Sequence, residues 1–273
     1  MKSNLHIHTT YSDGRKSIKE VIDLIEENKM TLFSITDHDN VDSCYYMETV
    51  ETKARYINGV EISAYLDKDY LGDNRFNTAH LLVFGFDYKT IKKYLELWKE
   101  QRDQELLAFI LKYNDENIEK LNVTQNRDNI LCELVNHGKA KNKRHAFIYM
   151  SEATDYKVCI PTINEAFKAA KEAGGLIIWA HPYELINVTF KDEISFEQLC
   201  LIADAMIKLG LDGLEADYYF YDDKKKETLF SLIDEMNLSY TKGSDYHGRD
   251  TDVIHFDSIK RKNFLIKQKA NRN

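Results

Sequence analysis

The feature that most constrains the fold of this chain is an alternation of short apolar runs with longer amphipathic segments. Seven short runs have the character of strands, and they span residues 3–8, 31–39, 56–63, 79–86, 176–182, 210–217 and 239–247. Segments between them carry apolar residues at helical spacing, such as Ile18, Val21, Ile22 and Ile25. Strands that alternate with helices predict an α/β fold with a parallel sheet. Seven strands favour a seven-stranded variant of the TIM-type barrel, although an open doubly wound sheet has the same local pattern.

One long segment interrupts this alternation. Between residues 89 and 161 no convincing strand is found, and residues 91–113 have the pattern of a long helix. Its apolar side is formed by Ile91, Leu95, Trp98, Leu106, Phe109, Ile110 and Tyr113. We therefore expect residues 1–88 and 162–273 to form one barrel domain, and residues 89–161 to form a mainly helical insertion that covers the active site.

The composition excludes several classes of protein. With 273 residues, of which 43% are hydrophobic and 30% charged, the chain is long enough to bury a substantial core. Its start lacks the pattern of a signal peptide, and no apolar run approaches the roughly 18 residues of a membrane span, so we expect a cytoplasmic protein without membrane contact. The four cysteines are scattered without a C-x-x-C pair, which argues against a disulfide framework and against a thiolate zinc site.

The net charge of −8 argues against a protein that coats nucleic acid non-specifically, because such binding needs a basic surface. The charge is unevenly distributed, however. Residues 89–172 carry 15 Lys and Arg against 13 Asp and Glu, whereas the rest of the chain carries 22 against 32. Residues 138–145, "GKAKNKRH", concentrate four cationic side chains. This segment is interpreted either as a solvated helix end or loop, or as an element that binds an anion.

Polar residues occur where a parallel barrel builds its site, at the carboxyl ends of the strands. In an extended strand, side chains two residues apart leave on the same face, so His6 and His8 can converge on one point. The other strand-end residues are Asp13, His38, Glu61, His181, Asp245 and His247. His80 is less regular, since it precedes the apolar run of its strand. Six of the nine histidines of the chain belong to this set.

Each of these residues taken alone could be a helix cap or a hydrogen-bonded core histidine, but the joint pattern predicts a polynuclear metal site. Strand ends on one face of a barrel converge, and so many polar groups are costly to bury without partners. Divalent ions are the natural partners, and imidazole and carboxylate donors without thiolate suit Mn²⁺, Zn²⁺ or Fe better than Mg²⁺. We therefore expect a polynuclear site with divalent metal ions as cofactors.

Six motifs follow one another along the chain: "HIHTTYSDG", "ITDHD", "GVEIS", "AHLL", "AHP" and "GSDYH". Together they resemble the PHP family (polymerase and histidinol phosphatase domain), and the resemblance covers most of the chain outside the insertion. It implies a distorted (β/α)7 barrel with a trinuclear metal site that hydrolyses phosphoesters.

The resemblance also implies a role for each residue of the motifs. The first ion would be held by His6, His8, Glu61 and Asp245. Glu61 would bridge to a second ion held by His80 and His181, and the third ion would be held by Asp13, His38 and His247. Glu61, Asp245 and His247 are the residues we expect in catalysis, in which the bridged ions supply a hydroxide nucleophile. Asp37 and Asp39 flank His38 and are expected to orient the ligands.

Asp13, the helical insertion, Arg102 and the "KRH" residues resemble the stand-alone members of the family, which act on nucleoside bisphosphates, AMP or short RNA ends. Other members tend to have His at the position of Asp13. Arg102 and Arg144 are candidates for bidentate contacts to a substrate phosphate. Lys143 and His145 lie beside Arg144 in the sequence and are predicted to bind the substrate too, with weaker support from Lys139 and Lys141.

The activity we expect is hydrolysis of a phosphomonoester of a small, nucleotide-like substrate. An exonuclease that trims short RNA or DNA ends is the nearest alternative, and residues 138–145 would then contact the strand. A catalytically idle metal-binding module that serves a partner is an alternative from another class, and the complete ligand set argues against it. The sequence leaves open the substrate, the metal, mono- against diesterase activity and the oligomeric state.

Overall fold

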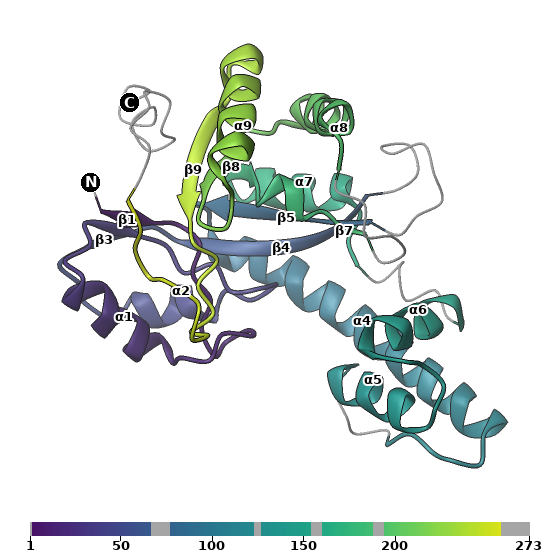
Figure 1. Cartoon of the computed structure of the whole chain (residues 1–273). Helices are drawn as coiled ribbons and strands as arrows, with labels where there is room; N and C mark the ends of the chain where they lie inside the picture. Colours follow the sequence, from purple (N-terminus) through teal and green to yellow (C-terminus); the bar gives the residue numbers. More distant parts are fainter. Residues whose placement is uncertain (1, 67–76, 123–126, 154–159, 188–193, 258–273) are drawn as a thin grey trace.

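The structure is a computed structural model, and it describes residues 2–66, 77–122, 127–153, 160–187 and 194–257 (Figure 1). Its strands form two sheets. The first has three short parallel strands in the order β1-β2-β3. They are β1 (Ser3–Asn4), β2 (Leu32–Phe33) and β3 (Arg55–Tyr56).

Helix α1 (Ile18–Glu27) follows β1, and α2 (Asp42–Met47) lies between β2 and β3. A capping box starts α1: the Ser17 hydroxyl accepts a hydrogen bond from the Glu20 backbone, and the Glu20 carboxylate accepts one from the Ser17 backbone. The apolar stripe predicted for this helix is confirmed, because all four of its residues are buried.

The larger sheet has the order β4-β5-β6-β8-β9, and β7 pairs with β5. Its strands are β4 (Gly59–Leu66), β5 (Asn77–Phe84), β6 (Leu176–Trp179), β7 (Ile186–Asn187), β8 (Gly213–Tyr218) and β9 (Ser239–Gly243). The pairs β6-β8 and β8-β9 are parallel, as the alternation predicted. The prediction of a parallel sheet is wrong at β5, which runs antiparallel to both β4 and β6. Only residues 67–76 separate β4 from β5, and a parallel pair needs a crossover of about a dozen residues or more.

Backbone hydrogen bonds join the two sheets on both sides. The Leu5 amide beyond β1 donates to the Lys242 carbonyl of β9, at 2.9 Å, and the Glu61 amide of β4 donates to the Asp37 carbonyl beyond β2, at 3.3 Å. The segments that follow β1 and β2 therefore run beside β9 and β4. This arrangement brings the polar residues that follow the short strands to the larger sheet.

Three helices complete the α/β layers: α7 (Ile163–Glu172), α8 (Phe196–Leu209) and α9 (Asp223–Met236). Helix α7 packs against β4, β5 and β6, whereas α9 packs against β8 and β9. Both α7 and α8 begin with capping boxes, formed by Thr162 with Glu165 and by Ser195 with Gln198. Their buried faces and the strands form one large apolar core.

The segment between β5 and α7 contains α4 (Tyr88–Glu116), α5 (Arg127–Asn136) and α6 (Lys143–Ala153). All seven residues predicted for the apolar side of α4 are buried. The first part of the helix, with Ile91, Leu95 and Trp98, packs into the main core. Its second part, from Leu106 to Tyr113, packs with α5 and α6 into a separate apolar core. Helix α4 is therefore a rod that carries a small helical body away from the sheets (Figure 1).

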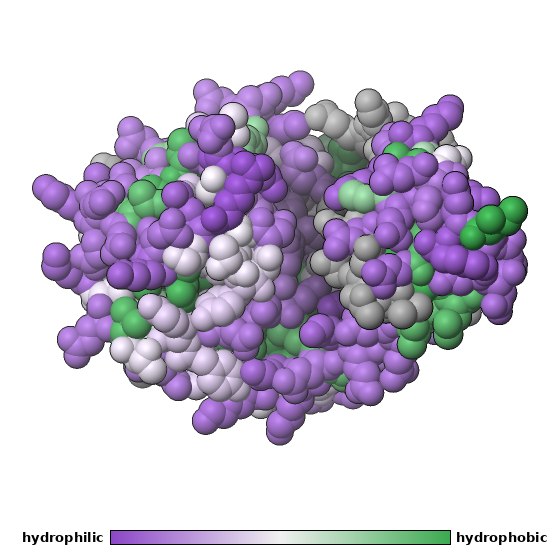
Figure 2. All heavy atoms as spheres, turned by 90° about the horizontal axis from the view of Figure 1, so that it is seen from below, coloured by the Kyte–Doolittle hydropathy of each residue, from purple (hydrophilic) through white to green (hydrophobic). Residues whose placement is uncertain are grey.

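Seen from below, the surface is hollowed between the part that carries α1 and α2 and the part that carries α5 and α6 (Figure 2). Hydrophilic residues line much of this hollow (Figure 2). None of the helices in the described ranges is long and apolar enough to span a membrane.

Candidate metal centre

Four side chains from β4 and from the segments after β1 and β9 meet at one point. His6 Nε2 lies 3.1 Å from His8 Nε2, 3.0 Å from Glu61 Oε2 and 3.3 Å from Asp245 Oδ1. His8 Nε2 lies 3.1 Å from each of the same two oxygens. Around a tetrahedral ion with bonds of about 2.0–2.1 Å, neighbouring ligand atoms are about 3.3 Å apart. These four atoms are therefore spaced like the ligands of one ion.

The other oxygen of Glu61 faces a second pair of histidines. His80 Nδ1 lies 2.9 Å and His181 Nε2 3.0 Å from Glu61 Oε1. His80 reaches this point because β5 runs antiparallel to β6. The His80 carbonyl accepts a hydrogen bond from the amide of Ala180, the residue that follows β6. The reversed strand explains why His80 precedes its apolar run while the other predicted ligands follow theirs.

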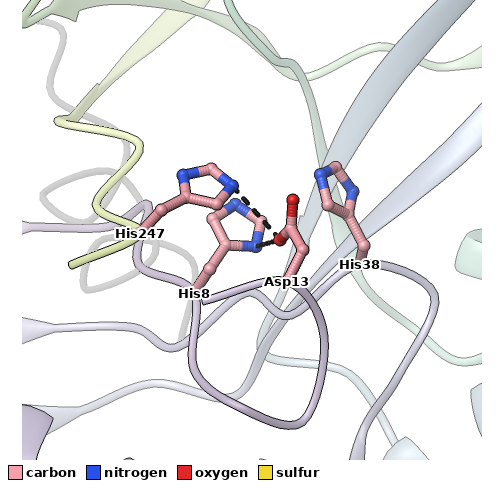
Figure 3. Close-up of side chains that lie close together, drawn as sticks. All are labelled: His8, Asp13, His38 and His247. Atoms are coloured by element: carbon pink, nitrogen blue, oxygen red, sulfur yellow. Dashed lines mark ion pairs between the residues drawn. The ribbon is translucent and has the colours of Figure 1, made fainter. Parts of the chain in front are cut away.

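A third group consists of Asp13, His38 and His247, with His8 beside them (Figure 3). His247 Nε2 lies 3.2 Å from Asp13 Oδ1, and His8 Nδ1 lies 3.7 Å from the same oxygen. His38 stands on the other side of Asp13 (Figure 3) and also approaches Glu61, with 3.3 Å between its Nδ1 and Glu61 Oε2. The Asp13 side chain is 54% exposed, whereas Glu61 is fully buried. The cluster therefore opens to solvent at Asp13.

The donor set fits divalent cations. Nδ1 of His38 and Nδ1 of His80 are buried without a hydrogen-bond partner among the described residues, although each lies close to a Glu61 oxygen. Atoms that are this close but not aligned for hydrogen bonding have the geometry of ligands aimed at a common third atom. Imidazole and carboxylate donors together suit Mn²⁺, Zn²⁺ or Fe.

Electrostatics also favour a cation at the centre. Burial alone would raise the pKa of Glu61, but its interactions with the surrounding histidines outweigh that effect and hold the pKa well below its ordinary value. Burial would lower the pKa of His8, yet hydrogen bonds with Asp245 and Glu61 raise it to about 9. The carboxylates therefore stay ionised. They favour a positive charge beside them, which either a protonated histidine or a metal ion can supply.

A family model described as the PHP domain matches residues 4–172, which is more than half of the chain. The matched segment contains all the residues of the cluster that precede α7. The chain belongs to the PHP family. With the metal-ligand groups described above, it is a metal-dependent hydrolase, a phosphoesterase of this family.

Relatives of this PHP protein cover nearly its whole length. The phosphoribosyl 1,2-cyclic phosphate 1,2-diphosphodiesterase of Eggerthella lenta is 21% identical over 274 residues, which cover 93% of this chain and 97% of the relative. A structure from Bifidobacterium adolescentis, assigned as a metal-dependent phosphoesterase, is 22% identical with a TM-score of 0.63 and covers 98% of this chain and 94% of the other. The structure of an amidohydrolase from Chromobacterium violaceum, with bound sulfate and no metal, is 19% identical with a TM-score of 0.71. It covers 100% of this chain and 97% of the other. These two structures support the α/β fold.

Asp37 holds the loop of the PHP domain that carries Asp13. Its carboxylate is buried and accepts hydrogen bonds from the Thr9 amide at 2.7 Å and from the Ser12 hydroxyl at 2.7 Å. The Asp39 carboxylate accepts a hydrogen bond from the Ser63 amide, at 3.0 Å, and the Asp39 amide donates one to the Glu61 carbonyl, at 2.8 Å. Both aspartates that were predicted to orient the ligands thus contact segments that carry ligands.

Three of the five non-glycine residues with positive φ in the described ranges lie at this site. They are Asp39, His181 and Asp245, with φ values of 48°, 26° and 53°. Such conformations cost about 1–3 kcal/mol each and persist only where the surroundings hold them. The fold therefore holds His181 and Asp245 in place against local backbone preference.

The sequence analysis missed three residues that contact the cluster. Glu215 of β8 is fully buried against His6, Tyr218 donates a hydrogen bond to Asp245 Oδ2 at 3.1 Å, and Asp252 accepts one from the His247 amide at 2.8 Å. The one signal that could have identified Glu215 is its position, a carboxylate inside a strand that ends at the site. Tyr218 and Asp252 carry no comparable signal.

The residues predicted to bind the substrate lie on α4 and α6. Arg102 is close to the cluster, because its Nη1 lies 3.5 Å from Asp39 Oδ2 and both side chains are 18% exposed. Lys143 and His145 are exposed in the first turn of α6. The side chain of Arg144 lies outside the described part of the structure.

Proposed function

We propose that this PHP protein hydrolyses a phosphomonoester of a small, nucleotide-like substrate at this cluster. The observation that carries the proposal is the position of Glu61. Its two oxygens face two separate pairs of histidines at 2.9–3.1 Å, which is the arrangement expected of a carboxylate that bridges two ions.

In this proposal the nine predicted ligands keep the grouping expected from the motifs. His6, His8, Glu61 and Asp245 would hold one ion; Glu61, His80 and His181 would hold another; and Asp13, His38 and His247 would hold the third. Divalent ions bound there supply Lewis acidity toward a phosphate and a nucleophile from water at neutral pH. Since the cluster opens at Asp13, the substrate phosphate approaches from that side.

The insertion supplies the contacts that choose the substrate. Arg102 lies beside Asp39, one residue from His38, so its guanidinium is near enough to the ligands to hold an anion bound there. Arg144, Lys143 and His145 are proposed to contact the substrate from the start of α6. We also assign residues 89–161 to the insertion, and residues 1–88 and 162–273 to a distorted barrel, whose seven strands would be β1, β2, β4, β5, β6, β8 and β9. The backbone hydrogen bonds that join the two sheets on both sides support that barrel.

The Eggerthella lenta relative acts on a cyclic phosphate, which is a phosphodiester, so diester hydrolysis is the competing activity to test. The experiment supplies the chain with Mn²⁺ or Zn²⁺. It then compares p-nitrophenyl phosphate, bis-p-nitrophenyl phosphate, a nucleoside monophosphate, a nucleoside bisphosphate, a ribose cyclic phosphate and a short RNA. The proposal predicts the highest kcat/KM for a nucleoside mono- or bisphosphate. A higher kcat/KM for the cyclic phosphate or for the RNA would contradict the proposal and favour a phosphodiesterase or an exonuclease. A chain that binds metal but hydrolyses none of these substrates would be a catalytically idle module.

A further inference from the structure

A buried carboxylate outside the predicted ligand set contacts two of the ligands. Glu215 lies in β8 and is fully buried. Its Oε1 and Oε2 lie 3.0 Å and 3.1 Å from His6 Nδ1, and Oε2 also accepts a hydrogen bond from the His181 amide at 3.0 Å. Glu215 thus touches one ligand from each of the two groups that share Glu61.

The contact with His6 determines which ring nitrogen faces the cluster. An ionised carboxylate only accepts hydrogen bonds, so the His6 nitrogen beside it must carry the proton. In the neutral ring the lone pair is then on Nε2, the nitrogen that lies 3.0 Å from Glu61 Oε2. A carboxylate on the outer nitrogen of a ligand histidine also makes the ring more basic and fixes its orientation.

The contact with His181 holds a strained backbone. His181 has a φ of 26° and lies two residues beyond the end of β6, and its amide is directed to Glu215 Oε2. Its ring reaches Glu61 Oε1 from this position. Glu215 therefore satisfies a buried amide that has left the regular strand pairing.

Space for Glu215 depends on a glycine in the neighbouring strand. A Cβ atom on Gly243 of β9 would lie 2.0 Å from Glu215 Oε1 and 2.4 Å from His6 Cβ. The φ of Gly243 is not in the left-handed region, so the backbone itself would tolerate alanine. The lack of a side chain at Gly243 is what lets the carboxylate and the imidazole meet.

We propose that Glu215 is a positioning residue that sets the tautomer of His6 and the backbone of His181, and so couples the two metal positions that share Glu61. The inference rests on the proposed metal function, because it gives these histidines the role of ligands. It predicts that metal affinity at both positions depends on a side chain that binds no metal.

The decisive variant is Glu215→Gln, which keeps the size of the side chain but presents an amide group to His6. The amide nitrogen is a donor and opposes a proton on Nδ1, while the amide oxygen can still accept from the His181 amide. Loss of such a partner typically costs 10–100-fold in metal affinity or activity. We expect Mn²⁺ and Zn²⁺ to bind about 10–100-fold more weakly in competition with a chromophoric chelator, and the absorption spectrum of bound Co²⁺ to change.

A matched control lies two residues further along the same strand. Asp217 is also fully buried, but its carboxylate pairs with Lys226 Nζ at 3.0 Å. Asp217→Asn removes a buried charge from β8 and keeps an oxygen for Lys226. It should leave the metal affinity and the Co²⁺ spectrum as in the wild type, even if the melting temperature falls.

Gly243→Ala tests the same contact while Glu215 is intact, and it should weaken metal binding in the same way. Wild-type affinity and an unchanged Co²⁺ spectrum in a folded Glu215→Gln variant would overturn the inference. If that variant did not fold, wild-type affinity and an unchanged Co²⁺ spectrum in a folded Gly243→Ala variant would overturn the inference in its place. A wild-type chain that bound no metal would instead defeat the proposed function, so the two failures can be told apart.

Discussion

The ligand cluster and the helical insertion are built on opposite principles. In the cluster, polar side chains from both sheets lie together and most of them are buried, and each contacts others of the group. In the small body formed by the end of α4 with α5 and α6, the buried residues are apolar, and Lys143 and His145 at its surface are exposed. The difference shows where the chain can change: the cluster is fixed by the fold, whereas the surface of the insertion is free to vary.

The physical reason is the cost of burying polar atoms. A buried carboxylate or imidazole without its partner loses the full free energy of its hydration, so each member of the cluster depends on the others. Exposed cations keep most of their water, so the fold depends less on them. We therefore expect substitutions in the cluster to abolish activity, and substitutions in the insertion to change which substrate is used or how stable the chain is.

The largest effect is expected for Glu61→Gln. The variant keeps the volume of the side chain but removes the charge between the two histidine pairs, so both groups lose an anionic donor. Since a partner that only supports a ligand is worth about 10–100-fold, losing the shared ligand should lower kcat by more than about 100-fold and reduce the metal bound per chain. His137→Ala is the control, because His137 contacts Tyr113 in the insertion. Near-normal turnover in the Glu61 variant would remove Glu61 from the ligand set.

An intermediate effect is expected for Arg102→Ala, at the point where the insertion meets the cluster. If Arg102 holds the substrate, losing about 1.5–3 kcal/mol of charge-assisted hydrogen bonding should raise KM for a nucleotide about 10–200-fold and leave the metal content unchanged. Lys112→Ala, at an exposed cation further along α4, should leave KM unchanged. A fall in kcat and in metal content with KM unchanged would instead indicate that Arg102 acts by holding Asp39 in place.

The smallest effect on turnover is expected inside the insertion. Leu134 is fully buried in the small apolar core, so Leu134→Ala should destabilise the chain by about 2–5 kcal/mol. The control is Leu107→Ala on α4, where a side chain that is 44% exposed should change stability by less than about 0.5 kcal/mol. Chemical denaturation measures both. Metal content should be unchanged in each variant, and loss of metal from the folded Leu134 variant would show that the two regions depend on each other.

The sequence was most informative where a repeated pattern has a single physical cause. Apolar residues at helical spacing must be buried together, and the stripes of α1 and α4 are buried as predicted. Strand ends meet at one edge of a sheet, and the nine predicted ligand side chains do lie together. Which of them bind metal, and how many ions they hold, remains a prediction.

The features that the sequence did not reveal depend on distant contacts. The direction of β5 follows from the length of its connection to β4 and from its pairing, neither of which changes the period of its apolar residues. Glu215 has the local pattern of any carboxylate in a strand. Its role depends on His6, 209 positions away in the sequence, and on the space left by Gly243.

The most direct test of the central claim is the metal content of the wild-type chain. The chain is loaded with Mn²⁺ or Zn²⁺, dialysed and analysed by mass spectrometry for metal per polypeptide, together with hydrolysis of p-nitrophenyl phosphate before and after treatment with a chelator. Our account predicts roughly two to three tightly bound ions per chain, activity that disappears with the chelator, and recovery when metal is returned. A folded chain that retains no metal, or one whose hydrolysis is unaffected by the loss of its metal, would contradict it.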